Sequence, residues 1–103
     1  MDYFLKTEAS EIGFRVERNN GESVDEVNGF LKTLWARGLS RLTIRTYGYG
    51  LVVLYRWMAA TGRSVSVLTD EILMDWVISM RERGVSPHTI NHRLVTTRLF
   101  FSY

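Results

Sequence analysis

The sequence lacks several features on which whole classes of protein depend. Cysteine is absent from its 103 residues, which excludes disulfide bonds and thiolate metal sites and suits a reducing compartment, so we expect a cytoplasmic protein. No basic segment followed by an apolar one opens the chain, and we therefore expect no signal peptide. The longest apolar run, residues 51–55, is far shorter than the about 20 residues that span a bilayer, so we expect no membrane partner.

The residue patterns of common enzyme sites are also missing. The chain has no glycine-rich loop suited to phosphate, no paired carboxylates and no nucleophile and base arranged as in a triad. His88 and His92 have a four-residue spacing that can chelate a metal ion, but they lack a third ligand and are better explained as exposed polar side chains. We therefore expect no catalysis, cofactor or metal within these residues.

What the chain does contain is enough apolar material for one domain, since 46% of its residues are hydrophobic. Its spacing predicts four helices over about residues 24–37, 40–61, 69–83 and 86–103. The predicted buried stripes are Val27, Phe30, Leu31 and Leu34; Ile44, Tyr47, Leu51, Leu54, Tyr55 and Met58; Ile72, Leu73, Trp76, Val77 and Met80; and Ile90, Leu94, Thr97 and Phe101.

Residues with strong capping preferences mark the ends of these helices. Ser23 with Glu26 predicts a capping box at the first start, and Ser40 and Ser86 are predicted N-caps of the second and fourth helices. Pro87, the single proline, suits the first helical position. Glycines are expected just past the ends of the first three helices, at positions 38, 62 and 84.

Residues 1–22 have a different pattern from the rest. Ile12, Phe14 and Val16 alternate with polar residues or glycine, which predicts one short strand before the turn-like Asn19-Asn20-Gly21. A single strand cannot bury its edges, so we expect residues 1–22 to be an extended or flexible N-terminal segment. The helical domain is expected over residues 23–103.

Charge is distributed unevenly along the chain. Residues 1–26 hold seven acids and three bases, whereas residues 27–69 hold six bases and residues 83–103 hold three, with no acid in either segment. The four remaining acids fall in the predicted third helix. This segregation indicates a basic face suited to a phosphate backbone, or a solvated surface with chance clustering of charge.

Unexplained polar residues gather where the second and fourth helices begin. The candidate DNA-binding residues are Arg41, Thr43, Arg45 and Thr46 on the second helix and Ser86, His88, Thr89, Asn91, His92 and Arg93 on the fourth. Helix N-termini favour anions, and arginine and asparagine side chains contact phosphates or bases. For Ser40 and Ser86, capping alone is the favoured explanation, with phosphate contact as an additional role.

Two stretches resemble the SAM-like core-binding domain of tyrosine recombinases, the phage-integrase type: GLSRLTIRTYGYGLVVLYRWMAATG and LTDEILMDWVISMRERGVSPHTINHRLVTTRLFFSY. The similarity covers about residues 24–103. It is carried by Ser40, Thr43, Ile44 and Tyr47, by Trp57, Gly62, Leu68 and Thr69, by Gly84, Ser86, Thr89 and Ile90, and by Leu94, Arg98, Phe100 and Phe101. Gly48, Gly50 and Thr97 depart from the family pattern, which usually has larger helix formers or an aliphatic residue there.

The resemblance implies an all-α fold, a compact four-helix orthogonal bundle of the SAM-like type preceded by the extended segment. It also implies a clamp in which this domain covers one face of double-stranded DNA, with its second and fourth helices near the major groove, while a separate catalytic domain covers the other. The expected partners are DNA and other recombinase protomers. The nucleophilic tyrosine of the family belongs to the catalytic domain, so none of the five tyrosines here is expected to act as one.

Two other functions stay open from the residues. A helical protein–protein interaction module without DNA binding would show an exposed apolar patch and self-association. A helix-turn-helix regulator fits less well, because the linker over residues 62–68 is longer than that motif prefers.

Overall fold

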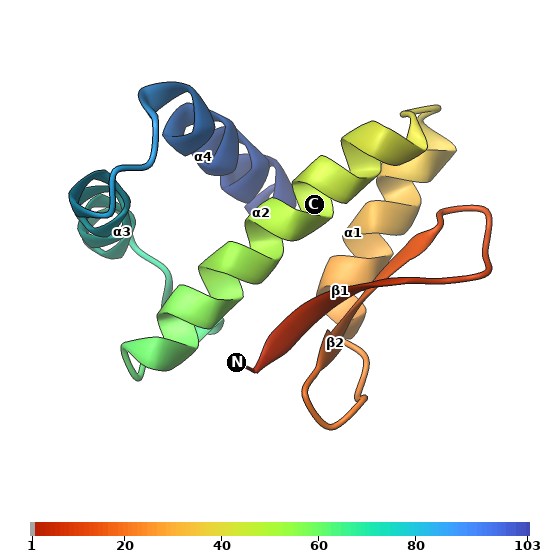
Figure 1. The fold of residues 1–103 in the computed structure, drawn as a ribbon, viewed down its shortest axis with the longest axis horizontal. Coiled ribbons are helices and arrows are strands. Elements are labelled where there is room, and N and C mark those ends of the chain that lie inside the picture. Colours follow the sequence, from red (N-terminus) through yellow and green to blue (C-terminus); the bar gives the residue numbers. More distant parts are fainter. Residues whose placement is uncertain (1) are drawn as a thin grey trace.

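The computed structural model describes residues 2–103, a β-hairpin followed by four α-helices (Figure 1). The elements are β1 (Tyr3–Thr7), β2 (Phe14–Arg18), α1 (Asp25–Ala36), α2 (Arg41–Ala60), the short 3₁₀ helix η1 (Val65–Val67), α3 (Asp70–Glu82) and α4 (Pro87–Phe101). The long helix α2 runs through the middle, with α1 and the hairpin on one side and α3 and α4 on the other. Within residues 2–103, no helix combines the length and the apolar character needed to cross a bilayer.

The helix ends follow the local sequence closely. Three side chains accept a hydrogen bond from the backbone N–H three residues on: Ser40 from Thr43 at 3.2 Å, Thr69 from Ile72 at 3.3 Å and Ser86 from Thr89 at 3.2 Å. Pro87 occupies the first position of α4, and the three predicted terminal glycines have positive φ angles of 86°, 69° and 81°. The predicted caps of the second and fourth helices are therefore confirmed.

The predicted capping box of the first helix is wrong. Val24 occupies the N-cap position of α1, and no side chain caps the helix. The Ser23 hydroxyl instead accepts a hydrogen bond from the Asn28 amide at 2.9 Å, and the Glu26 carboxylate accepts one from the Tyr55 hydroxyl at 2.9 Å. Both side chains make tertiary hydrogen bonds instead, and these override the local preference for a capping box.

The expectation of an all-α fold is also wrong in one respect, because the N-terminal segment forms a hairpin. The two strands pair in antiparallel register from Tyr3 opposite Arg18 to Thr7 opposite Phe14. Val16 is fully buried and Tyr3 packs edge-on to Tyr55 of α2, with ring centroids 5.2 Å apart, so the hairpin shares the helical core. The residue pattern predicts one isolated strand, so the prediction lacks β1.

The Asn28 side chain fastens the hairpin to α1. Its amide oxygen accepts from the Val16 N–H at 2.8 Å, and its amide nitrogen donates to the Val16 carbonyl at 3.0 Å. Since Val16 lies on the strand of the hairpin that faces α1, the asparagine takes the place of a neighbouring strand residue. It supplies a partner for the Val16 N–H and shares the Val16 carbonyl with the Val24 N–H, which donates to that carbonyl at 3.1 Å.

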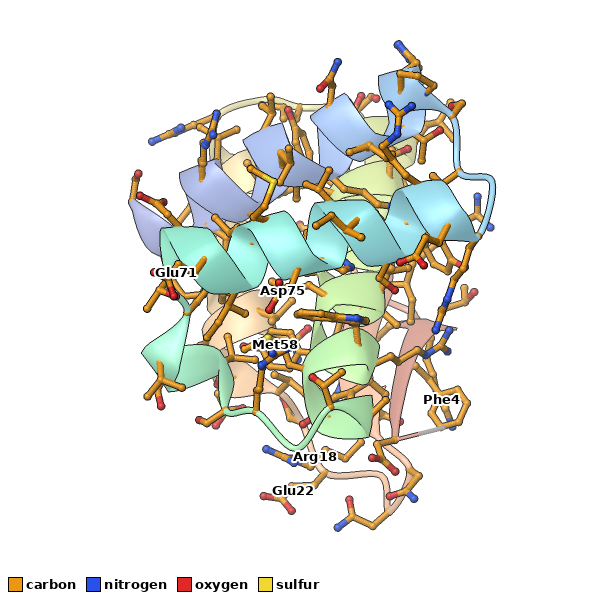
Figure 2. The ribbon with its side chains drawn as sticks, turned by 90° about the vertical axis from the view of Figure 1, so that its left-hand side faces the viewer. Phe4, Arg18, Glu22, Met58, Glu71 and Asp75 are labelled. Atoms are coloured by element: carbon orange, nitrogen blue, oxygen red, sulfur yellow. The ribbon has the colours of Figure 1, made fainter. Side chains whose placement is uncertain are left out.

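The core lies between α2 and the elements on both of its sides. Its fully buried side chains include Leu31, Ile44, Leu51, Leu54, Met58 and Trp76. α3 crosses over α2 near Met58 (Figure 2), where the rings of Trp57 and Trp76 lie 6.4 Å apart. The stripes predicted for the first three helices are therefore buried or half-buried as expected.

The predicted stripe of the fourth helix is wrong at its last position. Phe101 is 46% exposed, whereas Phe100 is 6% exposed and meets Phe30 of α1 edge-on, with centroids 5.5 Å apart. Both positions fit helical spacing from Ile90, so the position of α1 decides between them. Thr97 is buried as expected, and its hydroxyl donates to the Arg93 carbonyl at 2.8 Å, which explains how a polar residue is tolerated there.

The two glycines inside α2 lie at different helix contacts. A Cβ atom at Gly48 would come within 3.0 Å of Leu5 Cδ1 and 3.5 Å of Leu31 Cδ1, so this glycine lets β1 and α1 approach α2. A Cβ atom at Gly50 would lie 3.8 Å from both Arg93 Cγ and Thr96 Cγ2, which is ordinary contact distance. A methyl group at Gly48 would therefore have to displace the end of the Leu5 side chain slightly, while Gly50 leaves room for a methyl group.

Opposite stability effects are expected at these two glycines. Gly50→Ala should raise the free energy of unfolding by about 0.5–1 kcal/mol, because alanine favours the helix and meets no clash. Gly48→Val should lower it by about 1–3 kcal/mol, because the added methyl groups press on Leu5 and Leu31. Urea denaturation followed by circular dichroism measures both, and a destabilised Gly50→Ala would contradict this account of the α2–α4 contact.

Candidate nucleic-acid interface

The first halves of α2 and α4 meet along a shallow groove of about 200 Å³. Its lining residues are Thr46, Tyr49, Gly50, His88, Thr89, His92 and Arg93. The ring of His92, one of these residues, stacks on Tyr47, with centroids 5.4 Å apart and planes 29° from parallel. The side chains repeat at one-turn spacing on each helix, which is why they face the same groove.

Five of the ten predicted site residues come together in this groove: Thr46, His88, Thr89, His92 and Arg93. The first turns of α2 and α4 both lie along the upper edge of the molecule in Figure 1, α2 at the right and α4 at the left. The remaining five, Arg41, Thr43, Arg45, Ser86 and Asn91, do not line it. Arg45 lies one helical turn before Tyr49, is exposed and lengthens the same face of α2.

Arg41 is held away from α4 by the hairpin. Its guanidinium contacts Gly13 at a point where a Cβ atom would clash, and it lies 5.9 Å from the centre of the Phe14 ring. Gly13 has a φ of +87°, so the turn that receives the arginine is one that favours glycine. Arg41 therefore flanks the groove from the side of the hairpin.

The hydroxyls at the two helix starts are used within the helices themselves. The Ser40 and Thr43 hydroxyls lie 2.9 Å apart, and the Ser86 hydroxyl donates to that of Thr89 at 3.0 Å. These four groups satisfy one another and cap the first turns, as the interpretation of Ser40 and Ser86 as caps requires. The backbone N–H groups of the first turns still give each end a partial positive charge.

The arginines near the α2–α4 groove form no ion pair within residues 2–103. Within residues 2–103 the acids pair only in the hairpin, where Glu8 and Glu17 contact Lys6 and Arg15, and between Arg63 and Asp75 at 3.1 Å. Arg45 and Arg93 have no acidic partner in this part of the chain. Their charge is therefore available to an external anion.

The described residues contain no metal-binding cluster, and Tyr55 does not have the character of an activated nucleophile. His88 and His92 share the groove, but residues 2–103 contain no cluster of three or more histidine, cysteine or acidic side chains that could hold a metal. Burial, together with the hydrogen bond to Glu26, raises the pKa of Tyr55 far above its ordinary value. A nucleophilic phenol needs the opposite shift, so Tyr55 is a core residue that donates a hydrogen bond.

Tyr49 is a groove residue that is absent from the candidate residues predicted from the sequence. Its ring is 47% exposed on the wall of the groove. The signal was its position one turn after Arg45 and three residues after Thr46, on the polar face of the helix.

A family model described as the N-terminal SAM-like domain of phage integrase matches residues 27–103. The chain belongs to this family. The match begins in the first turn of α1, after the hairpin, and continues through α4, so the SAM-like domain includes both walls of the groove. In phage integrases the SAM-like N-terminal domain is not the catalytic domain. Comparisons with curated proteins and with solved structures found no match for the chain.

Proposed function

We propose that this SAM-like domain is the DNA-binding domain of a site-specific tyrosine recombinase and that it holds the core recombination site through the N-terminal parts of α2 and α4. The observation that carries the proposal is the groove where these two helices meet, with Arg93 in its wall and Arg45 beside it, neither paired with an acid in residues 2–103. Integrases act on DNA, and the family match supports that ligand.

In this proposal, phosphate contacts supply most of the affinity. Arg45 and Arg93 neutralise phosphates, and the first turns of the two helices direct backbone N–H groups toward the same polyanion. His88 and Asn91 are exposed and carry ring nitrogens or an amide that can reach base edges, so they supply a modest base readout. Ser86 and Thr43 act mainly by holding the first turns in place.

The wider assembly is also part of the proposal. The domain covers one face of the duplex while the catalytic domain of the recombinase covers the other, and further protomers join it on the DNA. Residues 23–103 form the DNA-binding unit, and the hairpin at residues 2–18 supports α2 from outside the groove. A protein-interaction module without DNA binding is the alternative, which the following titration distinguishes.

The chain is expected to bind duplex DNA in a strongly salt-dependent way. If three phosphates are neutralised, the log–log slope against salt is about −2.7, and raising salt from about 50 to 200 mM weakens binding roughly 40-fold. Fluorescence anisotropy of a labelled duplex measures this, with affinity at low salt expected near the micromolar range. Failure to bind at the lowest salt, together with self-association in sedimentation, would favour the interaction module.

A further inference from the structure

A second and larger groove of about 490 Å³ lies between α2, α3 and α4. Its floor is apolar and consists of Val53, Trp57, Trp76, Met80 and Val85. Ala59 and Ala60, both exposed, line its end at the last turn of α2. Tyr49 and Arg93 belong to both grooves, so the second groove continues from the first along α2.

Three arginines surround this apolar floor, one from each helix: Arg56 from α2, Arg83 from the end of α3 and Arg93 from α4. Within residues 2–103 none of them is in an ion pair. Asp2 is the single acid among the lining residues. The rim therefore carries an excess of positive charge that the described part of the chain does not neutralise.

The hydrogen bonds of the inner arginines leave most of their donors unused. The half-buried Arg93 directs Nη1 to the sulfur of Met80 at 3.6 Å, which is a weak acceptor, and Arg56 donates from Nε to the Tyr3 carbonyl at 2.8 Å. A guanidinium has five N–H donors arranged in a fork that fits a carboxylate. Both groups can thus bind an acidic ligand without losing the contacts they have.

The dimensions and chemistry of the groove favour a peptide over a DNA backbone. A duplex, about 20 Å across, cannot enter a cavity of about 490 Å³, and its hydrated phosphates gain nothing from a floor of tryptophan and valine. One large apolar side chain flanked by carboxylates matches both the floor and the rim. The shallow α2–α4 groove has the opposite character, with polar side chains and helix N-termini.

We propose that the groove between α2, α3 and α4 binds an acidic peptide segment of another protein, with one large apolar side chain against the half-buried Val53 and Trp57 and carboxylates at Arg56, Arg83 and Arg93. This gives the domain a protein-docking surface beside the DNA surface. Arg93 is shared with the candidate DNA surface, whereas Arg56 and Arg83 lie outside the candidate DNA-binding residues, so peptide binding can be tested in the absence of DNA.

A displayed library of random 12-residue peptides, selected on the immobilised chain, tests the proposal. Selection is expected to enrich sequences that hold two or more acids around a tryptophan, phenylalanine or leucine. Enriched sequences without acids, or no enrichment at all, would overturn it. An enriched peptide is then synthesised with a fluorescent label, and its Kd is measured by anisotropy.

Two substitutions and their matched controls locate the bound peptide. Arg83→Gln should weaken peptide binding about fivefold, because it removes one partner of a carboxylate. Ala60→Glu should weaken it about tenfold or more, because the added negative charge at the groove repels the acidic peptide. The controls are Arg81→Gln, the same change on α3 outside the groove, and Ala36→Glu, the same change at the last residue of α1. Both controls should leave the Kd within about twofold, since surface charges away from the ligand contribute little. Equal losses in variants and controls would place the peptide elsewhere.

The same variants distinguish a bound peptide from two other occupants of the groove, duplex DNA and a second copy of the chain. Arg83→Gln is expected to leave duplex binding within about twofold, because a single charge outside the DNA contact changes affinity little. A loss of duplex binding equal to the loss of peptide binding would make the groove part of the nucleic-acid surface and overturn the proposal. Self-association that Ala60→Glu abolishes would identify a second copy of the chain as the occupant, with the same consequence.

Discussion

Replacing Trp76 with alanine is expected to lower the free energy of unfolding by about 3–5 kcal/mol, the largest stability effect of any change considered for this protein. The indole is 1% exposed and joins α3 to α2 through its contact with Trp57. Its removal leaves a cavity between α2 and α3, whose contact depends on the Trp57–Trp76 pair. Since small domains have free energies of unfolding of only about 5–15 kcal/mol, the substitution would remove much of the protein's stability.

Urea or thermal denaturation measures the effect of Trp76→Ala, with a fall in Tm of about 12 °C or more expected for a domain of this size. Trp35→Ala is the matched control, because Trp35 is 40% exposed on α1. That substitution should cost less than about 1 kcal/mol. Equal losses at the two tryptophans would mean that α3 is not held to α2 by Trp76.

The double substitution Arg45→Met and Arg93→Met is expected to weaken duplex DNA binding roughly 30- to 100-fold at low salt. Each arginine lost removes one phosphate contact, so the log–log salt slope should become shallower by about 1.8. Methionine keeps the length of the aliphatic stem, which at Arg93 lies beside Gly50. The expected loss therefore reflects charge and hydrogen bonding rather than packing.

The control for the arginine pair is Arg81→Met with Arg98→Met, which makes the same charge change on exposed positions of α3 and α4. These two side chains do not line the α2–α4 groove. Anisotropy titrations at several salt concentrations should show that the control pair keeps an affinity within about threefold of the unchanged chain. Similar losses of DNA affinity in both double variants would indicate diffuse electrostatic attraction, and the α2–α4 groove would then not be the DNA-binding site.

Arg41 illustrates how far the sequence could locate the candidate site. From the sequence it belongs with Arg45 at the start of a helix, yet its guanidinium lies on Gly13 and Phe14 of the hairpin. By contrast, Thr46, His88 and His92 line one groove. Helical periodicity fixes which side of a helix a residue occupies, but the neighbouring element decides whether the side chain is free.

The hairpin shows why the fold could be predicted only in part. The alternation of β1 is obscured by Phe4, an apolar side chain on its outer face, which Arg56 of α2 covers at 5.6 Å. The same helix supplies Gly48, whose missing side chain makes room for Leu5. Both contacts join residues more than forty positions apart, and no local pattern contains them.

The amino-acid sequence by itself determined the number of helices, most of their ends and the buried stripes of the first three. These depend on interactions within a few residues, as at Ser40, Ser86 and Gly84. Tertiary structure alone decided the hairpin, the choice of Phe100 over Phe101 and the two grooves along α2. Packing between distant segments selects among alternatives that local spacing leaves equal in energy, and a groove exists only where separate helices meet.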